Sequence, residues 1–169
     1  SLGLVGSEMC IRDRYTSGAT QDLVSFDDNG FTLGTLYSWG SVNGNSNSIV
    51  AWCWKAGGPA VTNNEGSISS LVSANQDAGF SIVKFTAQTS SSGTVGHGLG
   101  KKPAFWIWKD INGATGWYQY HQRMGASAWL QFDAQLAVTG NSAAWGGVDP
   151  TDTVFTHGGG FVNQGDIIM

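Results

Sequence analysis

The sequence contains few cysteines, few prolines and few charged residues. Its 169 residues include two Cys and three Pro, and charged side chains make up 12% of the chain. Two cysteines do not supply the disulfide framework of a small secreted scaffold. The net charge of −4 comes with no basic cluster that would neutralise phosphates, so we expect no nucleic-acid partner. No apolar run approaches the ~20 residues that span a bilayer, so we expect no membrane partner either.

Glycine and aromatic residues are abundant instead. The chain has 25 Gly, eight Trp and eight Phe, together with many Ser, Thr and Asn. Glycine with small polar residues is typical of short strands joined by tight turns, and the aromatic rings supply material for a core. This composition argues against disorder, and the length fits one domain or one domain with a fragment of a neighbour.

The clearest strand signals flank a glycine-rich loop. Residues 80–86 are rich in β-branched and aromatic side chains, and residues 104–109 are apolar on both faces, as in a strand between two layers. Between them, alternating glycines at residues 96–100 and Pro103 indicate an irregular loop. We therefore predict an all-β fold, an antiparallel β-sandwich of the jelly-roll type.

The same pattern recurs along the chain. Further strands are expected over residues 31–34, 49–55, 68–74, 116–121, 129–132, 154–156 and 166–169, while residues 136–144 fit a loop or one helical turn. Within residues 116–121, alternation places Trp117, Gln119 and His121 on one face of the strand. Tyr118 and Tyr120 then share the other face.

The N-terminal residues look foreign to the fold. Residues 4–14 are similar to an accidental translation of a sequencing-library adaptor, so residues 1–14 are set aside and the natural start is expected to be missing. The alternative is a genuine N-terminal segment. Setting these residues aside removes Cys10 and leaves Cys53 alone, within the apolar residues 49–54. We expect Cys53 to be a small buried apolar side chain.

A series of motifs occurs in order along the chain, at residues 26–34, 50–58, 66–70, 72–75, 78–83 and 94–100. Together they resemble an uncharacterised β-rich domain family of marine bacteriophage structural proteins, and the resemblance extends from about residue 22 to the C-terminus. The family has no established chemistry, and the resemblance implies a component of a virion or tail fibre. The chain departs from the family at residues 105–108, which carry Phe-Trp-Ile-Trp in place of a plain aliphatic strand.

The resemblance also implies a domain organisation. In related chains a concanavalin-like or laminin-G-like sandwich often precedes this region, so residues 15–58 are expected to be its closing strands. Residues 59–65 would then be a linker, and residues 66–169 a β-sandwich domain truncated in its last strand.

Sequence motifs for catalysis and metal binding are incomplete. Residues 96–102 lack the glycine spacing and the Ser/Thr of a phosphate-binding loop, and a structural turn explains them. Residues 157–160 resemble an esterase oxyanion loop, but the chain has no Gly-x-Ser-x-Gly elbow. None of His97, His121 and His157 is paired with another ligand at metal-binding spacing, so we predict no metal site.

Carboxylates occur mostly in predicted turns, at Asp27, Asp28, Asp149, Asp152 and Asp166. Aspartates there usually cap their own backbone. A glycosidase needs two carboxyl groups facing each other about 5–10 Å apart, an arrangement that sequence leaves open. We predict a protein without enzymatic activity and keep polysaccharide hydrolysis as an alternative.

Aromatic residues are the best candidates for a binding site. Exposed rings stack on sugars while neighbouring polar groups bind the hydroxyls. The candidate ligand-binding residues are Trp106, Trp108, Trp117, Tyr118, Tyr120 and His121. The alternative is that these rings fill the core of the sandwich.

Residues and resemblance together predict a non-catalytic phage virion or tail-fibre protein that binds host-surface carbohydrate. No cofactor is predicted. The expected partners are other virion proteins, a host-surface glycan and, from the phage context, further copies in a homotrimer. The protein would be made in the host cytoplasm and reside in the virion. The alternatives are a polysaccharide-degrading tail protein and a purely structural spacer or capsid-decoration domain.

Overall fold

A computed structural model describes residues 23–27, 29–34, 48, 53–88, 92–110, 115–132, 134–141, 143–159 and 167–168. The chain divides into two compact units, Ser1–Trp54 and Lys55–Met169. The described residues contain strands, turns and loops but no helix, and none of them forms a helix long and apolar enough to cross a membrane. The fold is therefore all-β, as predicted.

The described part of the first unit includes a β-hairpin. β1 (Leu23–Asp27) pairs antiparallel with β2 (Gly30–Leu33), and the register shifts between Leu23 and Ser25. The carboxylate of Asp27 accepts hydrogen bonds from the hydroxyl of Ser25, at 2.9 Å, and of Thr32, at 2.8 Å. The turn and strand predicted after Asp27 are thus confirmed.

The strand predicted at residues 49–55 lies mostly outside the described residues. Its described part, residues 53–55, is not in a strand, and Cys53 is exposed rather than buried. The predicted role of Cys53 as a buried apolar side chain is therefore wrong.

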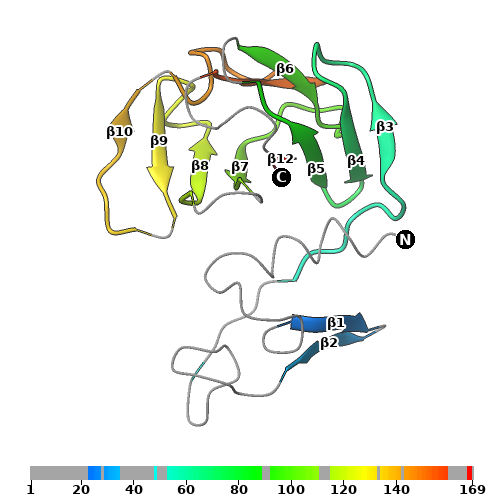
Figure 1. The fold of residues 1–169 in the computed structure, drawn as a ribbon. Coiled ribbons are helices and arrows are strands. Elements are labelled where there is room, and N and C mark those ends of the chain that lie inside the picture. The colour runs from blue at the N-terminus through cyan, green and yellow to red at the C-terminus, as the bar shows by residue number, and fades with distance from the viewer. Residues whose placement is uncertain are drawn as a thin grey trace. The chain divides into compact units, whose positions relative to one another are not determined.

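The second unit contains two four-stranded antiparallel sheets. The first has the order β12-β5-β4-β3 and the second β10-β9-β8-β7 (Figure 1). The strands of the first sheet are β3 (Val61–Asn63), β4 (Ser70–Asn75), β5 (Phe80–Thr86) and β12 (Ile167–Ile168). Those of the second are β7 (Phe105–Trp108), β8 (Tyr118–His121), β9 (Ala128–Gln131) and β10 (Thr139–Gly140).

A third antiparallel pair lies near the upper ends of both sheets in Figure 1. It consists of β6 (Gly93–Gly96) and β11 (Val154–His157), and a parallel bridge from Ile68 to Val95 links it to the segment that leads into β4. Together the three sheets enclose one core, which makes the unit sandwich-like.

Two segments differ from the sequence expectation because tertiary pairing outweighs local pattern. Residues 59–65 were expected to be a linker, but β3 lies within them and pairs with β4. The irregular loop expected between the strands is present at residues 97–103, but strand β6, which has no apolar alternation, precedes it and was not expected. A Cβ at Gly93 would contact the side chain of Ile68, so close packing explains glycine in this strand. In residues 136–144 the structure has the short strand β10 and the start of a turn.

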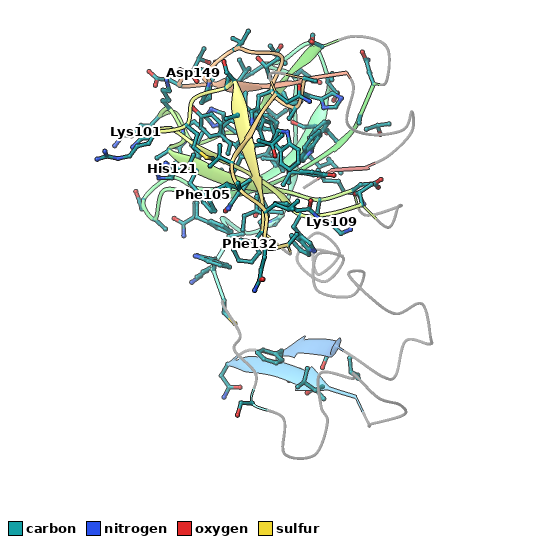
Figure 2. All side chains as sticks on the ribbon, turned by 90° about the vertical axis from the view of Figure 1, so that its left-hand side faces the viewer. Lys101, Phe105, Lys109, His121, Phe132 and Asp149 are labelled. Atoms are coloured by element: carbon teal, nitrogen blue, oxygen red, sulfur yellow. The ribbon has the colours of Figure 1, made fainter. Side chains whose placement is uncertain are left out.

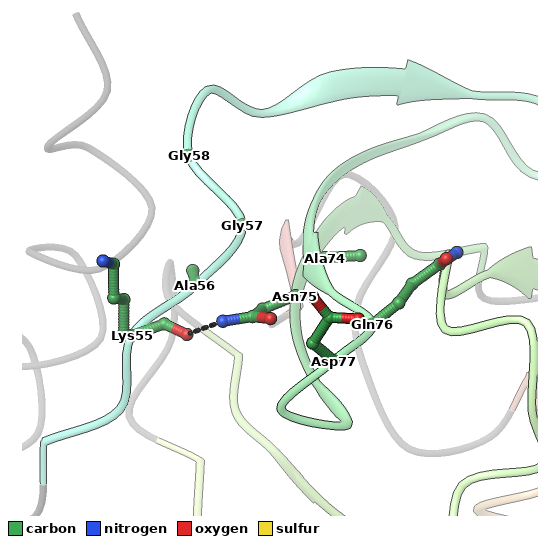
Figure 3. A pocket seen from close by; sticks show the side chains of 8 residues that line it. All are labelled: Lys55, Ala56, Gly57, Gly58, Ala74, Asn75, Gln76 and Asp77. Atoms are coloured by element: carbon green, nitrogen blue, oxygen red, sulfur yellow. Dashed lines mark hydrogen bonds between the residues drawn. The ribbon is translucent and has the colours of Figure 1, made fainter.

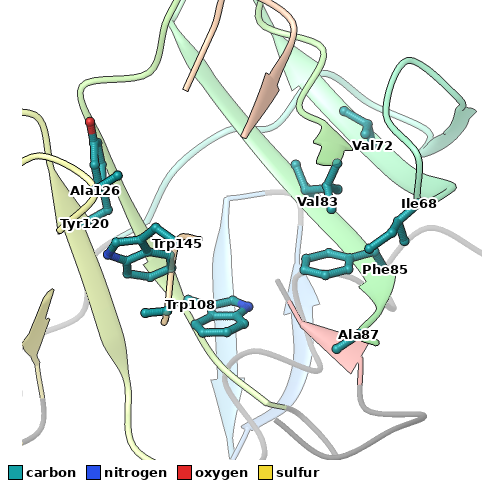
Figure 4. Close-up of a cluster of buried hydrophobic side chains, with 11 residues drawn as sticks. Ile68, Val72, Val83, Phe85, Ala87, Trp108, Tyr120, Ala126 and Trp145 are labelled. Atoms are coloured by element: carbon teal, nitrogen blue, oxygen red, sulfur yellow. The ribbon is translucent and has the colours of Figure 1, made fainter. Parts of the chain in front are cut away.

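The core lies between the sheets and is closed by the turn at residues 143–147. Figure 4 shows side chains from β4 and β5 facing those from β7 and β8, with Trp145 among them. Trp145 is fully buried, and its indole N–H donates to the carbonyl of Ala128 at 2.9 Å. The amide of Gly158, just after β11, donates to the carbonyl of Ala144 at 2.9 Å. The turn therefore joins the ends of β9 and β11 across the core.

Candidate functional site

The inner face of the sheet β7-β8-β9 belongs to the core. Trp106 is paired with Tyr120 and Trp108 with Tyr118 across β7 and β8. The rings of Trp106 and Tyr120 are stacked, with centroids 3.8 Å apart and planes 10° apart. Trp108 is 3% exposed and Tyr120 is 0% exposed, while Trp106 and Tyr118 pack against the same cluster.

Four predicted ligand-binding residues therefore face the core: Trp106, Trp108, Tyr118 and Tyr120. Their assignment to a binding surface was wrong, because burying a large ring against other rings is more favourable than exposing it to water. The alternative kept at the sequence level, that these rings fill the sandwich, is the correct one for them.

Tyr120 also has a polar contact at the edge of the core. Its hydroxyl donates to Oδ1 of Asp149 at 3.1 Å, and the same oxygen accepts the amide of Ala126 at 3.0 Å. Burial, and then the charge of Asp149, raise the pKa of Tyr120 to about 12. The phenol is thus a neutral structural donor and not a catalytic acid near neutral pH.

The opposite face of β7-β8-β9 carries a different set of side chains. Phe105 is paired with His121, Ile107 with Gln119, and Gln119 with Leu130. Directly paired residues in antiparallel strands point to the same side, and here that side is away from the core. The rings of Phe105 and His121 lie 6.5 Å apart, next to each other in Figure 2.

Trp117 and Phe132 extend this surface beyond the strands. The amide of Phe132 donates to the carbonyl of Trp117 at 2.7 Å, so the two residues continue the pairing of β8 with β9. Lys109 is buried and donates from Nζ to the carbonyl of Thr115, and its Nζ lies 6.0 Å from the centre of the Trp117 ring. This cation–π contact helps to hold the indole in place.

We define the outer face as this set of seven residues: Phe105, Ile107, Trp117, Gln119, His121, Leu130 and Phe132. Phe105 is 47% exposed and Phe132 is 45% exposed, and the other five are partly exposed. No charged carboxylate or amine belongs to this set. A surface of this composition suits a ligand with apolar ring faces and uncharged polar groups.

The two polar side chains of the outer face are open to a ligand. The amide of Arg123 donates to Nδ1 of His121 at 3.2 Å, so Nδ1 is the acceptor and the ring proton lies on Nε2. Among the described residues, neither Nε2 of His121 nor the side-chain amide of Gln119 has a hydrogen-bond partner. Polar atoms that are both buried and without a hydrogen-bond partner occur elsewhere in the described residues, but Nε2 of His121 and the side-chain amide of Gln119 are not among them, so both are accessible to solvent.

Of the sequence candidates, Trp117 and His121 lie on this surface. Sequence analysis missed Phe105, Ile107, Leu130 and Phe132 as surface residues, and left Gln119 out of the candidate set. The signal that could have found them is the strand face shared by Trp117, Gln119 and His121, since their partners on β7 and β9 must share it.

The other two histidines are buried near β6 and β11. His97 accepts the amide of Leu99 at Nδ1, at 3.2 Å, and its Nε2 lies 3.3 Å from the carbonyl of Thr151. Nε2 of His157 lies 3.1 Å from the carbonyl of Gln88, and its buried Nδ1 has no partner among the described residues. Burial lowers the pKa of both histidines, so both are structural neutral rings.

No group of three His, Cys, Asp or Glu side chains in the described ranges is placed to hold a metal ion. In both His97 and His157, Nε2 lies within hydrogen-bond distance of a backbone carbonyl. These nitrogen atoms are therefore poorly suited to ligate a metal.

A separate open groove lies beside the end of β4. Its volume is about 560 Å³, and its lining is small and polar, consisting of Lys55, Ala56, Gly57, Gly58, Ala74, Asn75, Gln76 and Asp77 (Figure 3). The side-chain amide of Asn75 donates to the carbonyl of Lys55 at 3.3 Å across it. The groove has one carboxylate, Asp77, and no aromatic ring among its lining residues. It has neither the acid pair of a glycosidase nor a stacking platform for sugars.

Comparison with known proteins identifies a family. Residues 7–169 match the model of a family described as "Domain of unknown function (DUF7483)". No curated protein and no solved structure matches the chain. The match extends over both compact units and starts inside residues 4–14. Because it covers nearly the whole sequence, the chain belongs to the DUF7483 family.

Proposed function

We propose that this chain is a non-catalytic structural domain of a bacteriophage virion, in a tail fibre or similar appendage, that binds host-surface carbohydrate through the outer face of β7-β8-β9. The virion context rests on the resemblance of the motifs to phage structural proteins. The binding role rests on one observation of the structure. Half-exposed aromatic rings flank an open amide and an open imidazole on one rigid sheet face.

The outer face has the features that sugar recognition requires. Pyranose rings have apolar faces that stack on aromatic side chains, and their hydroxyls need donors and acceptors close by. Phe105 and Phe132 provide exposed rings, and Gln119 and His121 lie between them on β8. Phe105, Gln119 and His121 lie on strands, which hold side chains more firmly than loops would and so lower the entropy cost of binding.

The chemistry of both surfaces supports binding without hydrolysis. Glycoside hydrolysis needs a pair of facing carboxyl groups. The outer face contains no carboxylate, and Asp77 is the single carboxylate that lines the groove of Figure 3.

The test is a glycan array probed with the full chain and with the double variant Phe105→Ala, Phe132→Ala. We expect a specific signal from the unmodified chain and its loss in the double variant. Leu71→Ala is the matched control, because Leu71 is similarly exposed, at 42%, but lies on β4 of the other sheet.

Three results would contradict the proposal. A blank array from folded protein would favour a spacer or capsid-decoration role. A signal that survives the double variant would place binding elsewhere. Release of reducing sugar from a bound polysaccharide would establish an enzyme.

A further inference from the structure

The outer face combines a fixed hydrogen-bond donor, an amide and an apolar ring within one small area. His121 and Gln119 are two residues apart on β8, so their backbones are about 7 Å apart. Phe105 lies beside His121, and Ile107 lies beside Gln119, both on β7. The face therefore places a donor next to a ring and an amide next to an aliphatic side chain.

His121 can act only as a donor toward a ligand. Its Nδ1 is occupied by the amide of Arg123, so the proton resides on the solvent-facing Nε2. A ligand group that binds there must offer an acceptor such as a carbonyl or hydroxyl oxygen. Gln119 has no partner among the described residues and can offer its carbonyl oxygen to a ligand N–H.

We infer that the outer face selects glycans carrying an N-acetylated amino sugar, with His121 and Gln119 as the specificity-determining residues. This inference rests on the proposed function. An acetamido group has a carbonyl oxygen for Nε2–H of His121 and an N–H for the side-chain carbonyl of Gln119. Its methyl group then packs on Phe105 and Ile107, which pair with these two residues.

The dimensions agree with this arrangement. Two hydrogen bonds of about 3 Å each, on either side of one amide, span roughly the separation of two alternate residues on a strand. A hydroxyl also donates and accepts, but from a single oxygen atom it reaches a shorter distance than an amide does, so it can bond only one of two side chains at this separation, and it buries no methyl group. Leaving a polar partner unpaired in a desolvated contact costs affinity, so plain hexoses should bind more weakly.

The experiment compares glycans that differ only in an acetamido or a hydroxyl group at carbon 2 of the sugar. An array of such pairs in the glucose and galactose series is probed with the full chain, and chitotetraose and cellotetraose serve as the solution pair for calorimetry. We expect the acetylated members to bind about ten times more tightly. Equal or stronger binding of the hydroxyl members would overturn the inference and leave the proposed function standing.

Variants of His121 distinguish the contribution of its N–H donor from that of its aromatic ring. His121→Phe keeps an aromatic ring and removes the donor, and should weaken binding of acetylated glycans three- to tenfold without changing that of plain hexoses. His121→Gln retains a side-chain N–H donor and should recover part of the affinity. Unchanged selectivity in His121→Phe would overturn the role of His121. A chain that binds no glycan in either series, but binds a protein, would refute both the inference and the proposed function.

Discussion

The two faces of the sheet β7-β8-β9 are made by alternate residues of the same strands, yet they differ in burial and in their polar contacts. The inner face packs Trp106 onto Tyr120 and buries Trp108 among the residues of β5 and the turn at 143–147. The outer face leaves Phe105 about half exposed, and Nε2 of His121 and the side-chain amide of Gln119 have no hydrogen-bond partner among the described residues.

This difference assigns separate roles to residues that the sequence presents as equivalent. Phe105 and Trp106 are both large aromatic residues in a strand of four, and nothing in their immediate neighbours tells them apart. Trp106 packs on the core and stabilises the fold, whereas the ring of Phe105 is exposed on the proposed binding surface. Substitutions on the inner face should therefore change stability, whereas substitutions on the outer face should change binding.

The largest effect is expected from removing the central core tryptophan. Trp145→Ala deletes a fully buried ring together with the hydrogen bond to Ala128. We expect a loss of about 3–5 kcal/mol in the free energy of unfolding, measured by urea denaturation. Leu136→Ala is the control, since Leu136 is 53% exposed and should cost less than about 1 kcal/mol. Equal losses in both variants would mean that Trp145 is not part of the core.

Acid should destabilise the fold through the buried histidines His97 and His157. Their pKa values are lowered by burial, so between these values and about 6.5 the unfolded chain binds more protons than the folded one. Stability is therefore full above pH 6.5 and falls as the pH drops below it, by at most about 1.4 kcal/mol per pH unit for each histidine.

Urea denaturation between pH 7.5 and pH 5 measures this dependence. His157→Gln should show a shallower dependence than the unmodified chain. A pH profile that is flat over this range would contradict the assignment of neutral buried rings.

The hydroxyl of Tyr120 contributes a smaller amount to stability, through its hydrogen bond at the edge of the core. Tyr120→Phe keeps the stack on Trp106 and removes the hydrogen bond to Asp149. We expect a loss of about 1–2 kcal/mol, because one hydrogen bond to a charged but partly exposed group is removed. A double-mutant cycle with Asp149→Ala isolates the pair, and a coupling energy near zero would show that the contact does not stabilise the fold.

The smallest change in the free energy of unfolding is expected from substitutions on the outer face. Phe105→Ala and Phe132→Ala each remove a ring that is about half exposed, and should cost about 1 kcal/mol. The same substitutions should reduce glycan binding at least tenfold, since they remove the rings on which the sugar is proposed to stack. Loss of stability comparable to that of Trp145→Ala would show that this face is covered by other parts of the chain.

Much of the fold was predictable from local pattern. The β-branched and aromatic residues 80–86 identified β5, the alternation in residues 116–121 identified β8, and the apolar residues 104–109 identified β7. The strands β3 and β6 were missed because they owe their existence to pairing partners far along the chain, β4 in one case and β11 in the other. Short polar or glycine-rich segments carry no periodic signal of such pairing.

The site was predictable only in part, for a related reason. Alternation correctly separated Trp117, Gln119 and His121 from Tyr118 and Tyr120 on β8. It could not tell which group faces the core, because a strand with aromatic residues on both sides has no polar side to mark the solvent. That choice depends on the sheet formed by β4 and β5, which packs against one side of β8 and not the other.

The most direct test is to map the binding surface by nuclear magnetic resonance. The full chain, labelled with ¹⁵N, is titrated with the oligosaccharide that gives the strongest array signal. We predict that shift changes concentrate at Phe105, Ile107, Gln119 and His121 and spare Leu71 on the other sheet. Changes confined to the groove around Asn75, or to the strands β3 and β4, would contradict the account of the outer face as the binding surface.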